Sequence, residues 1–165
     1  MPSAGERGAC YRRGMDDAGT LCLDCGLCCD GTLFGRVAID DESMAAVIAH
    51  RLPLLDTTDG AKMPLPCQGA EGVLCSLYLE RPSRCRQYTC ELRVAAAEER
   101  LSLDRARAVI EEVRRIRART APELPRGMPW WTVLARLRRA APGVRMALRR
   151  DLEALEAILE ARFWS

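Results

Sequence analysis

The chain has 165 residues, which fits one domain or a small module with a helical extension. Its 48% hydrophobic content is sufficient for a core. Its formal charge of +2 gives no indication of a partner bound mainly through charge. No run of about eighteen apolar residues occurs, and the first ten residues lack the apolar stretch of a secretory signal. We therefore expect a cytoplasmic protein with no membrane contact.

The first 50 residues predict one strand and one helix. Residues 1–20 are polar and aperiodic, so we expect a mobile lead-in in which Cys10 is not a ligand. Apolar alternation over residues 32–39 predicts a short strand. Asp40 is placed to cap a following helix, which should end soon after His50. The helix side chains expected to face the core are Met44, Val47 and Ile48.

Residues 53–72 are rich in Pro, Gly, Asp and Thr, and we expect a loop there. A Gln-Gly-Ala-Glu-Gly segment lies between Cys67 and Cys75 and predicts that the chain turns back as a short hairpin. A helix is then expected to begin at Pro82 and to carry two further cysteines, Cys85 and Cys90.

Three amphipathic helices are predicted beyond the last cysteine. Ser102 caps the first, Pro129 fits the first turn of the second, which covers about residues 130–140, and the third follows Pro142 and Gly143. The first has an apolar stripe of Ala106, Val109, Val113 and Ile116. The stripe of the third is Val144, Leu148, Leu152, Leu155, Ile158 or Leu159, and Phe163.

These elements predict an α+β fold that is mostly α. We expect a small cysteine-rich, metal-stapled module with a short hairpin, followed by three helices packed on it. The expected division is a lead-in at 1–20, a cysteine-cluster module at 21–92 and a helical extension at 93–165. The two halves differ in charge, with a net −4 over residues 1–92 and +6 over the remainder.

Nine cysteines are the most informative feature of the composition. Iron–sulfur clusters use C-x-x-C-x-x-C runs whose fourth thiolate comes from elsewhere, and zinc uses C-x-x-C pairs with a second pair farther along. Without an export signal, this number of cysteines favours metal ligation over disulfides. The cofactor-binding cluster is Cys22, Cys25, Cys28 and Cys29. The full set of metal-ligand candidates adds Cys67, Cys75, Cys85 and Cys90.

The arrangement of these eight thiolates stays open at the level of sequence. They can close two tetrahedral sites or one binuclear site, or hold one cluster and leave spare thiols. Neighbouring residues project differently, so Cys28 and Cys29 are not expected to face one metal together. His50 is the only histidine and lies outside every cysteine group, which favours a capping or surface role.

Three arginines near the later cysteines allow two interpretations. Arg81, Arg84 and Arg86 can lower thiol pKa values and offset the negative charge of a metal–thiolate centre. Alternatively, Arg81 and Arg86 only pair with carboxylates such as Glu80, Glu91 or Asp24. Gly26 is expected to permit a tight turn between ligands, and two tyrosines are expected to serve packing, Tyr78 and Tyr88.

The joint cysteine pattern resembles a known family. The segment Cys22-x-x-Cys25-Gly-x-Cys28-Cys29, the later Cys67, and the run from Cys75 to Cys90 resemble the YkgJ-like cysteine-cluster family. That family is described as a zinc- or iron-chelating CxxCxxCC domain, and the likeness covers residues 21 to about 92. A similar module occurs in flagellin lysine methylases, where the resemblance implies an iron–sulfur centre. The tail here shows no Gly-rich S-adenosylmethionine loop.

These observations allow three functions. The favoured one is a cytosolic protein that binds an iron–sulfur cluster, with 4Fe-4S favoured, or zinc or iron ions. The alternative is a metal- or thiol-dependent oxidoreductase or group-transfer enzyme that modifies a protein. A zinc-based nucleic-acid module is disfavoured, because the basic half lacks interleaved aromatic residues. The partner, a protein or small molecule, and the oligomeric state are not indicated.

The amphipathic helices generate a first testable prediction. Isolated helices of this length are marginal in water, so each needs an apolar partner surface. A fragment of residues 93–165 should show weak, non-cooperative helicity by circular dichroism, whereas the intact metal-bound protein should unfold cooperatively. A fragment that folds alone and binds duplex DNA with a steep salt dependence would instead favour the nucleic-acid interpretation.

Overall fold

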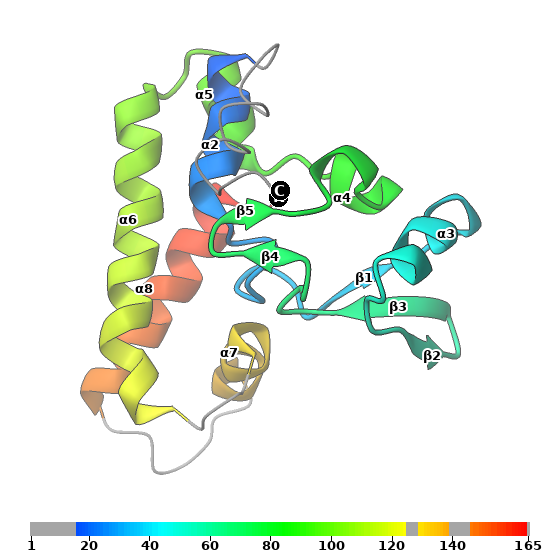
Figure 1. Cartoon of the computed structure of the whole chain (residues 1–165). Helices are drawn as coiled ribbons and strands as arrows, with labels where there is room; N and C mark the ends of the chain where they lie inside the picture. Colours follow the sequence, from blue (N-terminus) through cyan, green and yellow to red (C-terminus); the bar gives the residue numbers. More distant parts are fainter. Residues whose placement is uncertain (1–15, 125–128, 139–145, 165) are drawn as a thin grey trace.

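The computed structural model describes residues 16–124, 129–138 and 146–164. Cys10, Val144 and the Pro142–Gly143 break lie outside these ranges. The fold is α+β and mostly α, as predicted, with long helices on one side and a small sheet on the other. The hairpin and the short helix α4 (Ser83–Gln87) lie between them (Figure 1). None of the described helices is long and apolar enough to cross a membrane.

The first described helix is α2 (Asp17–Cys25), and it corrects the expectation of an irregular segment up to residue 20. The side chain of Asp16 caps it by accepting a hydrogen bond from the Gly19 N–H at 2.6 Å. The helix buries Leu21 and Leu23 and ends at Gly26, whose φ of 68° is left-handed. The local signal that could have indicated this helix is the Asp16 cap before a short apolar run.

A three-stranded antiparallel sheet forms from residues 36 to 64, in the order β1-β3-β2. Residues 36–38 of the strand predicted over 32–39 form β1, at one edge of the sheet, and two strands lie where a loop was expected over 53–72. The Thr57 hydroxyl donates to the Gly60 carbonyl at 2.7 Å, and Gly60 adopts φ 96°, so a tight turn joins two strands there. The strands are β1 (Arg36–Ala38), β2 (Leu55–Thr57) and β3 (Gly60–Pro64).

The predicted cap at Asp40 is confirmed and also anchors α4. Asp40 precedes α3 (Asp41–Ala49) and accepts hydrogen bonds from the Ser43 N–H at 2.9 Å and from the hydroxyl of Ser83 in α4. Hydrogen bonds from Ser43 and then Ser83 lower the pKa of Asp40 to about 2. The expected stripe is wrong at Ile48, which is 61% exposed, because the buried face of α3 runs through Ser43 and Val47.

The predicted hairpin between Cys67 and Cys75 is confirmed as β4 (Ala70–Glu71) and β5 (Leu74–Cys75). A short helical turn η1 (Tyr78–Glu80) follows it. The single helix expected to carry both Cys85 and Cys90 is two helices, α4 and α5 (Glu91–Ala97). Extended backbone at Tyr88 separates them, and Cys90 precedes the first residue of α5.

Three of the helices that follow confirm the sequence prediction. They are α6 (Leu103–Thr120), capped by Ser102, then α7 (Trp130–Arg138) and α8 (Met146–Arg162), with a short η2 (Ala121–Glu123) after α6. The buried face of α6 includes Ile110 in place of the expected Val109. That difference is a one-residue shift around the helix, within the width of an apolar stripe. Of the two residues allowed for in the stripe of α8, Leu159 is the buried one.

One hydrophobic cluster joins the two halves of the chain. Leu21, Leu27 and Leu33 from the cysteine-bearing half pack with the buried faces of α6 and α8. The Tyr88 hydroxyl donates to the Phe163 carbonyl at 2.8 Å, and the Tyr88 ring meets Phe34 edge-on at 4.8 Å between centroids. The helices after residue 93 therefore pack against the cysteine-bearing segments. The domain boundary expected at residue 92 stays a prediction.

This shared core predicts that a substitution in α8 destabilises the cysteine-bearing half. Leu155→Ala removes a fully buried side chain, and we expect a loss of about 2–5 kcal/mol in the free energy of unfolding. Leu79→Ala is the matched control: Leu79 is 81% exposed, so its loss should cost less than about 0.5 kcal/mol. Urea unfolding followed by helicity and by thiol accessibility should give coincident transitions. Separate transitions would contradict a single core.

Candidate metal centre

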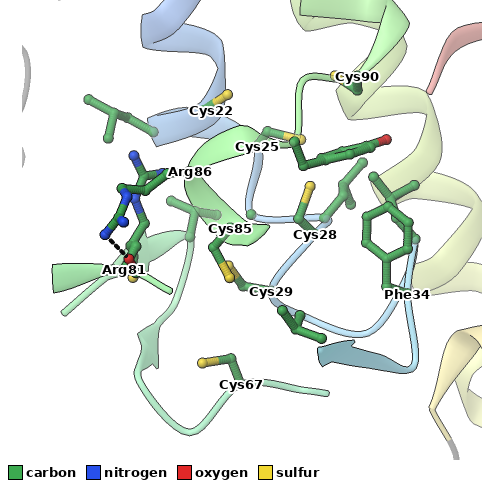
Figure 2. A pocket seen from close by; sticks show the side chains of 18 of the residues that line it. Cys22, Cys25, Cys28, Cys29, Phe34, Cys67, Arg81, Cys85, Arg86 and Cys90 are labelled. Atoms are coloured by element: carbon green, nitrogen blue, oxygen red, sulfur yellow. Dashed lines mark hydrogen bonds between the residues drawn. The ribbon is translucent and has the colours of Figure 1, made fainter. Parts of the chain in front are cut away.

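All eight candidate ligands line one cavity of about 640 Å³ (Figure 2). They are free thiols, and each except Cys22 is partly buried. Apolar side chains, among them Leu21, Leu27 and Leu65, form much of the cavity wall around them. Within the described ranges, no group of three or more side chains of Cys, His, Asp or Glu is placed to hold a metal ion. The thiols thus line one cavity without converging on a single point in it.

A first group of four thiols surrounds the end of α2. Cys22 and Cys25 lie in the last turns of α2, Cys28 follows the turn at Gly26, and Cys90 approaches from the start of α5 (Figure 2). Burial is the main cause that raises the pKa of Cys25 to about 12, and the neighbouring Cys90 and Cys22 raise it further. The pKa of Cys28 is raised by burial and then by Cys25, Cys29, Cys90 and Cys22.

A second group lies around the hairpin. It consists of Cys29, Cys67 before β4, Cys75 at the end of β5, and Cys85 in α4. Burial raises the pKa of Cys29 to about 12, with further contributions from Cys75, Cys67 and Cys85. Burial likewise raises the pKa of Cys85 to about 11, followed by Cys67 and Cys75. The cysteines that act on Cys29 and Cys85 thus belong to this second group, whereas Cys28 is influenced by Cys25 of the first group and by Cys29 of the second.

Main-chain N–H groups point at several of these sulfurs. Leu27 donates to Cys25, and Leu77 donates to Cys75. Gly69 and Ala70 donate to Cys67, which places two donors on one sulfur. Donors to the charged form stabilise a thiolate, so each of these lowers a pKa that burial raises. In thiolate metal centres, hydrogen bonds to the sulfurs are also among the factors that tune the site.

Arginines lie beside both groups, although burial outweighs their effect. Arg81 lowers the pKa of Cys22, Cys75 and Cys85, yet the net shift of each is upward because desolvation is the largest cause. Arg81 stacks on the Tyr78 ring, 3.9 Å from its centroid. Arg86 also lowers the pKa of Cys85 and pairs with Glu42 at 3.0 Å, a carboxylate that the sequence did not indicate as its partner.

Two arginines that sequence reasoning missed act on the first group. Arg93 lies one helical turn after Cys90, and this short spacing could have indicated it from the sequence. It lowers the pKa of Cys22. Arg114 comes from α6, and its guanidinium donates to the Asp24 carbonyl and, at 3.1 Å, to the Cys25 carbonyl. It also lowers the pKa of Cys25. No local sequence pattern could indicate this contact between residues so far apart in the chain.

The turn after the first group is held by a second contact from α6. Arg117 pairs with Asp30, whose other carboxylate oxygen accepts from the Thr32 N–H at 2.9 Å. The only histidine, His50, ends α3 and pairs with Glu80 at the surface, as expected for a residue outside the site. Tyr88 packs against Phe34 and hydrogen-bonds to the Phe163 carbonyl, in agreement with the packing role that the sequence predicts.

These features define a thiol-lined site on a small α+β scaffold, and comparison with known proteins agrees. The CxxCxxCC family model, described as a "putative zinc- or iron-chelating domain", matches residues 21–108, more than half of the chain. The chain therefore belongs to this family. Searches of curated proteins and of solved structures gave no significant match.

The turn at Gly26 provides a test of the first group. Alanine there adopts an unfavourable left-handed conformation, which costs about 1 kcal/mol, and its Cβ meets the Val73 Cα at 3.0 Å. Gly72→Ala is the matched control, because φ is 64° there but nothing lies within 4 Å of an added Cβ. We expect both variants to lose stability in urea and Gly26→Ala to lose more stability and more metal. Equal losses would contradict a tight approach at Gly26.

Proposed function

We propose that this protein is a cytosolic metal protein that holds an iron–sulfur cluster of the 4Fe-4S type through Cys22, Cys25, Cys28 and Cys90. The observation that carries the proposal is the gathering of these four thiols at one end of the shared cavity. The first three belong to a C-x-x-C-x-x-C run, and Cys90 comes from a distant segment, which is the arrangement typical of such clusters.

Burial of Cys25, Cys28 and Cys90 supports a charged cofactor over free thiols. A buried thiolate is costly unless a cation compensates its charge, and metal binding is linked to thiol deprotonation. The surrounding chain supplies part of that compensation through the Leu27 N–H at Cys25 and the guanidiniums of Arg93 and Arg114. A bound cluster would supply one-electron transfer. The four cysteines would hold it, and the side chains around them would screen it from water.

The second candidate is an oxidoreductase or group-transfer enzyme that uses the same centre. It is favoured by the room in the cavity, which also contains the side chains of Tyr78, Arg81, Arg84 and Arg86. A cationic and aromatic rim of this kind suits an anionic or planar group of a substrate. Anaerobic reduction of the purified protein, followed by a search for substrate-dependent reoxidation, distinguishes an enzyme from a carrier or structural protein.

Metal content and colour test the proposed function. Anaerobically purified protein should show a broad visible absorption band, iron and acid-labile sulfide. Cys25→Ser should abolish the band and lower the melting temperature, because metal binding contributes folding free energy in small cysteine sites. Cys10→Ser is the matched control and should change neither. Full cluster content in Cys25→Ser, or a colourless wild-type protein containing only zinc, would contradict the proposal.

A further inference from the structure

We propose that Arg81 and Arg84 form, on the solvent side of the cysteine cavity, a binding site for the anionic head group of a small organic molecule. The ligand class is an organic carboxylate or phosphate ester whose apolar or planar body lies along the cavity wall. The proposal deepens the second candidate function, and it rests on that function only in treating the cavity as a place that admits a substrate.

The charges that line the cavity do not balance within the described residues. The charged lining consists of four arginines and one carboxylate, which are Arg81, Arg84, Arg86, Arg93 and Asp16. The Arg93 guanidinium lies 3.9 Å from the Asp16 carboxylate. Arg86 pairs with Glu42, which lies outside the cavity lining, at 3.0 Å. Over the same described ranges, no carboxylate forms an ion pair with Arg81 or Arg84.

Arg81 is held in place although it has no such carboxylate. Its Nε donates to the Tyr78 carbonyl at 3.1 Å, and its guanidinium stacks on the Tyr78 ring. The Arg81 carbonyl accepts a hydrogen bond from the Arg86 guanidinium at 2.6 Å, and Figure 2 shows these two arginines together on one side of the cavity. None of these contacts uses the two terminal nitrogens of Arg81. A guanidinium fixed in this way loses little conformational entropy when it binds an anion.

Arg84 supplies the second charge from an anchored helix. It lies in α4, is exposed and lines the same cavity as Arg81. The preceding residue, Ser83, fixes this helix because its N–H donates to the Ser43 hydroxyl at 2.9 Å and its hydroxyl donates to Asp40. An anion at this place would therefore meet one preorganised guanidinium and one exposed guanidinium on a fixed backbone.

The thiols beside Arg81 do not neutralise its charge. Arg81 acts on Cys22, Cys75 and Cys85, and burial raises the pKa of each of these thiols above its ordinary value. As free thiols they are uncharged at neutral pH. If Arg81 only offset the charge of metal-bound thiolates, its removal would change the metal content and leave anion binding unchanged.

The rest of the cavity suits an organic body attached to the anion. Its volume of about 640 Å³ is typical of small-molecule sites, and its walls include Leu21, Leu27 and Leu65. Guanidinium groups bind carboxylates and phosphates through two parallel hydrogen bonds, which gives the head group a fixed orientation. Arg81 lies on the side of the cavity away from Cys28 (Figure 2). The head group would therefore lie apart from the centre of the CxxCxxCC run.

Binding of a fluorescent organic anion tests the site. The probe is anilinonaphthalene sulfonate, added to the full chain in its metal-loaded form, and the uncharged N-phenylnaphthylamine is the control probe. We expect one saturable site per chain for the anion, weakened by added KCl, and weaker, salt-independent binding of the control. Phenyl phosphate or benzoate should displace the anion, and the stronger competitor identifies the head group. Displacement by neither, or equal binding of the two probes, would overturn the proposal.

Variants locate the bound anion. Arg81→Gln and Arg84→Gln should each raise the dissociation constant of the sulfonate about tenfold, because each removes a charge-assisted hydrogen bond. Arg107→Gln is the matched control: Arg107 is exposed on α6, pairs with Asp104 at 3.4 Å and is not part of the cavity lining, so the constant should not change. Arg84 is exposed, so its variant should fold and is decisive even if Arg81→Gln does not. An unchanged constant in Arg84→Gln would overturn the proposal.

Metal content measured on the same samples separates this proposal from the proposed function. Arg84→Gln should keep the metal and the visible band while it loses anion affinity. A colourless wild-type protein that binds the sulfonate through Arg84 would overturn the cluster and support the anion site. A coloured protein whose sulfonate binding depends on neither arginine would support the cluster and overturn the anion site.

Discussion

Burial of thiols in one cavity is the constraint on which the rest of the structure depends. A thiol inside an apolar wall resists ionisation, and the pKa of Cys25 and of Cys29 is raised to about 12 mainly for this reason. The nearby arginines and main-chain N–H groups offset only part of that cost. In a zinc- or iron-chelating domain a bound metal ion would compensate the rest, so metal binding and the stability of this region are expected to be linked.

The helices after residue 93 make that burial possible. A cysteine-rich module of about 70 residues has little apolar surface to bury on its own. In this fold α6 and α8 supply the wall, and Leu155 and Phe163 share a core with Leu27 beside the cysteine run. Arg114 and Arg117 then fix the main chain of that run from α6. The basic character of this half partly serves these internal contacts, which weakens its interpretation as a nucleic-acid surface.

Two thiol groups in one cavity also suggest how the parts of the protein cooperate. The first group is built on a helix end and depends on α5 and α6, whereas the second is built on a hairpin and on α4. Each group is fixed by its own contacts, and the Cys28–Cys29 peptide joins them.

The sequence by itself determined the family and most of the element types. Local patterns were sufficient for the α+β class, the Asp40 and Ser102 caps, the Cys67–Cys75 hairpin and the eight ligand candidates, because caps, turns and cysteine spacing act within a few residues. Only the tertiary structure decided which cysteines lie near one another and that Arg114 contacts the main chain of the cysteine run. These contacts join residues far apart in the chain, and no local pattern in the sequence records them.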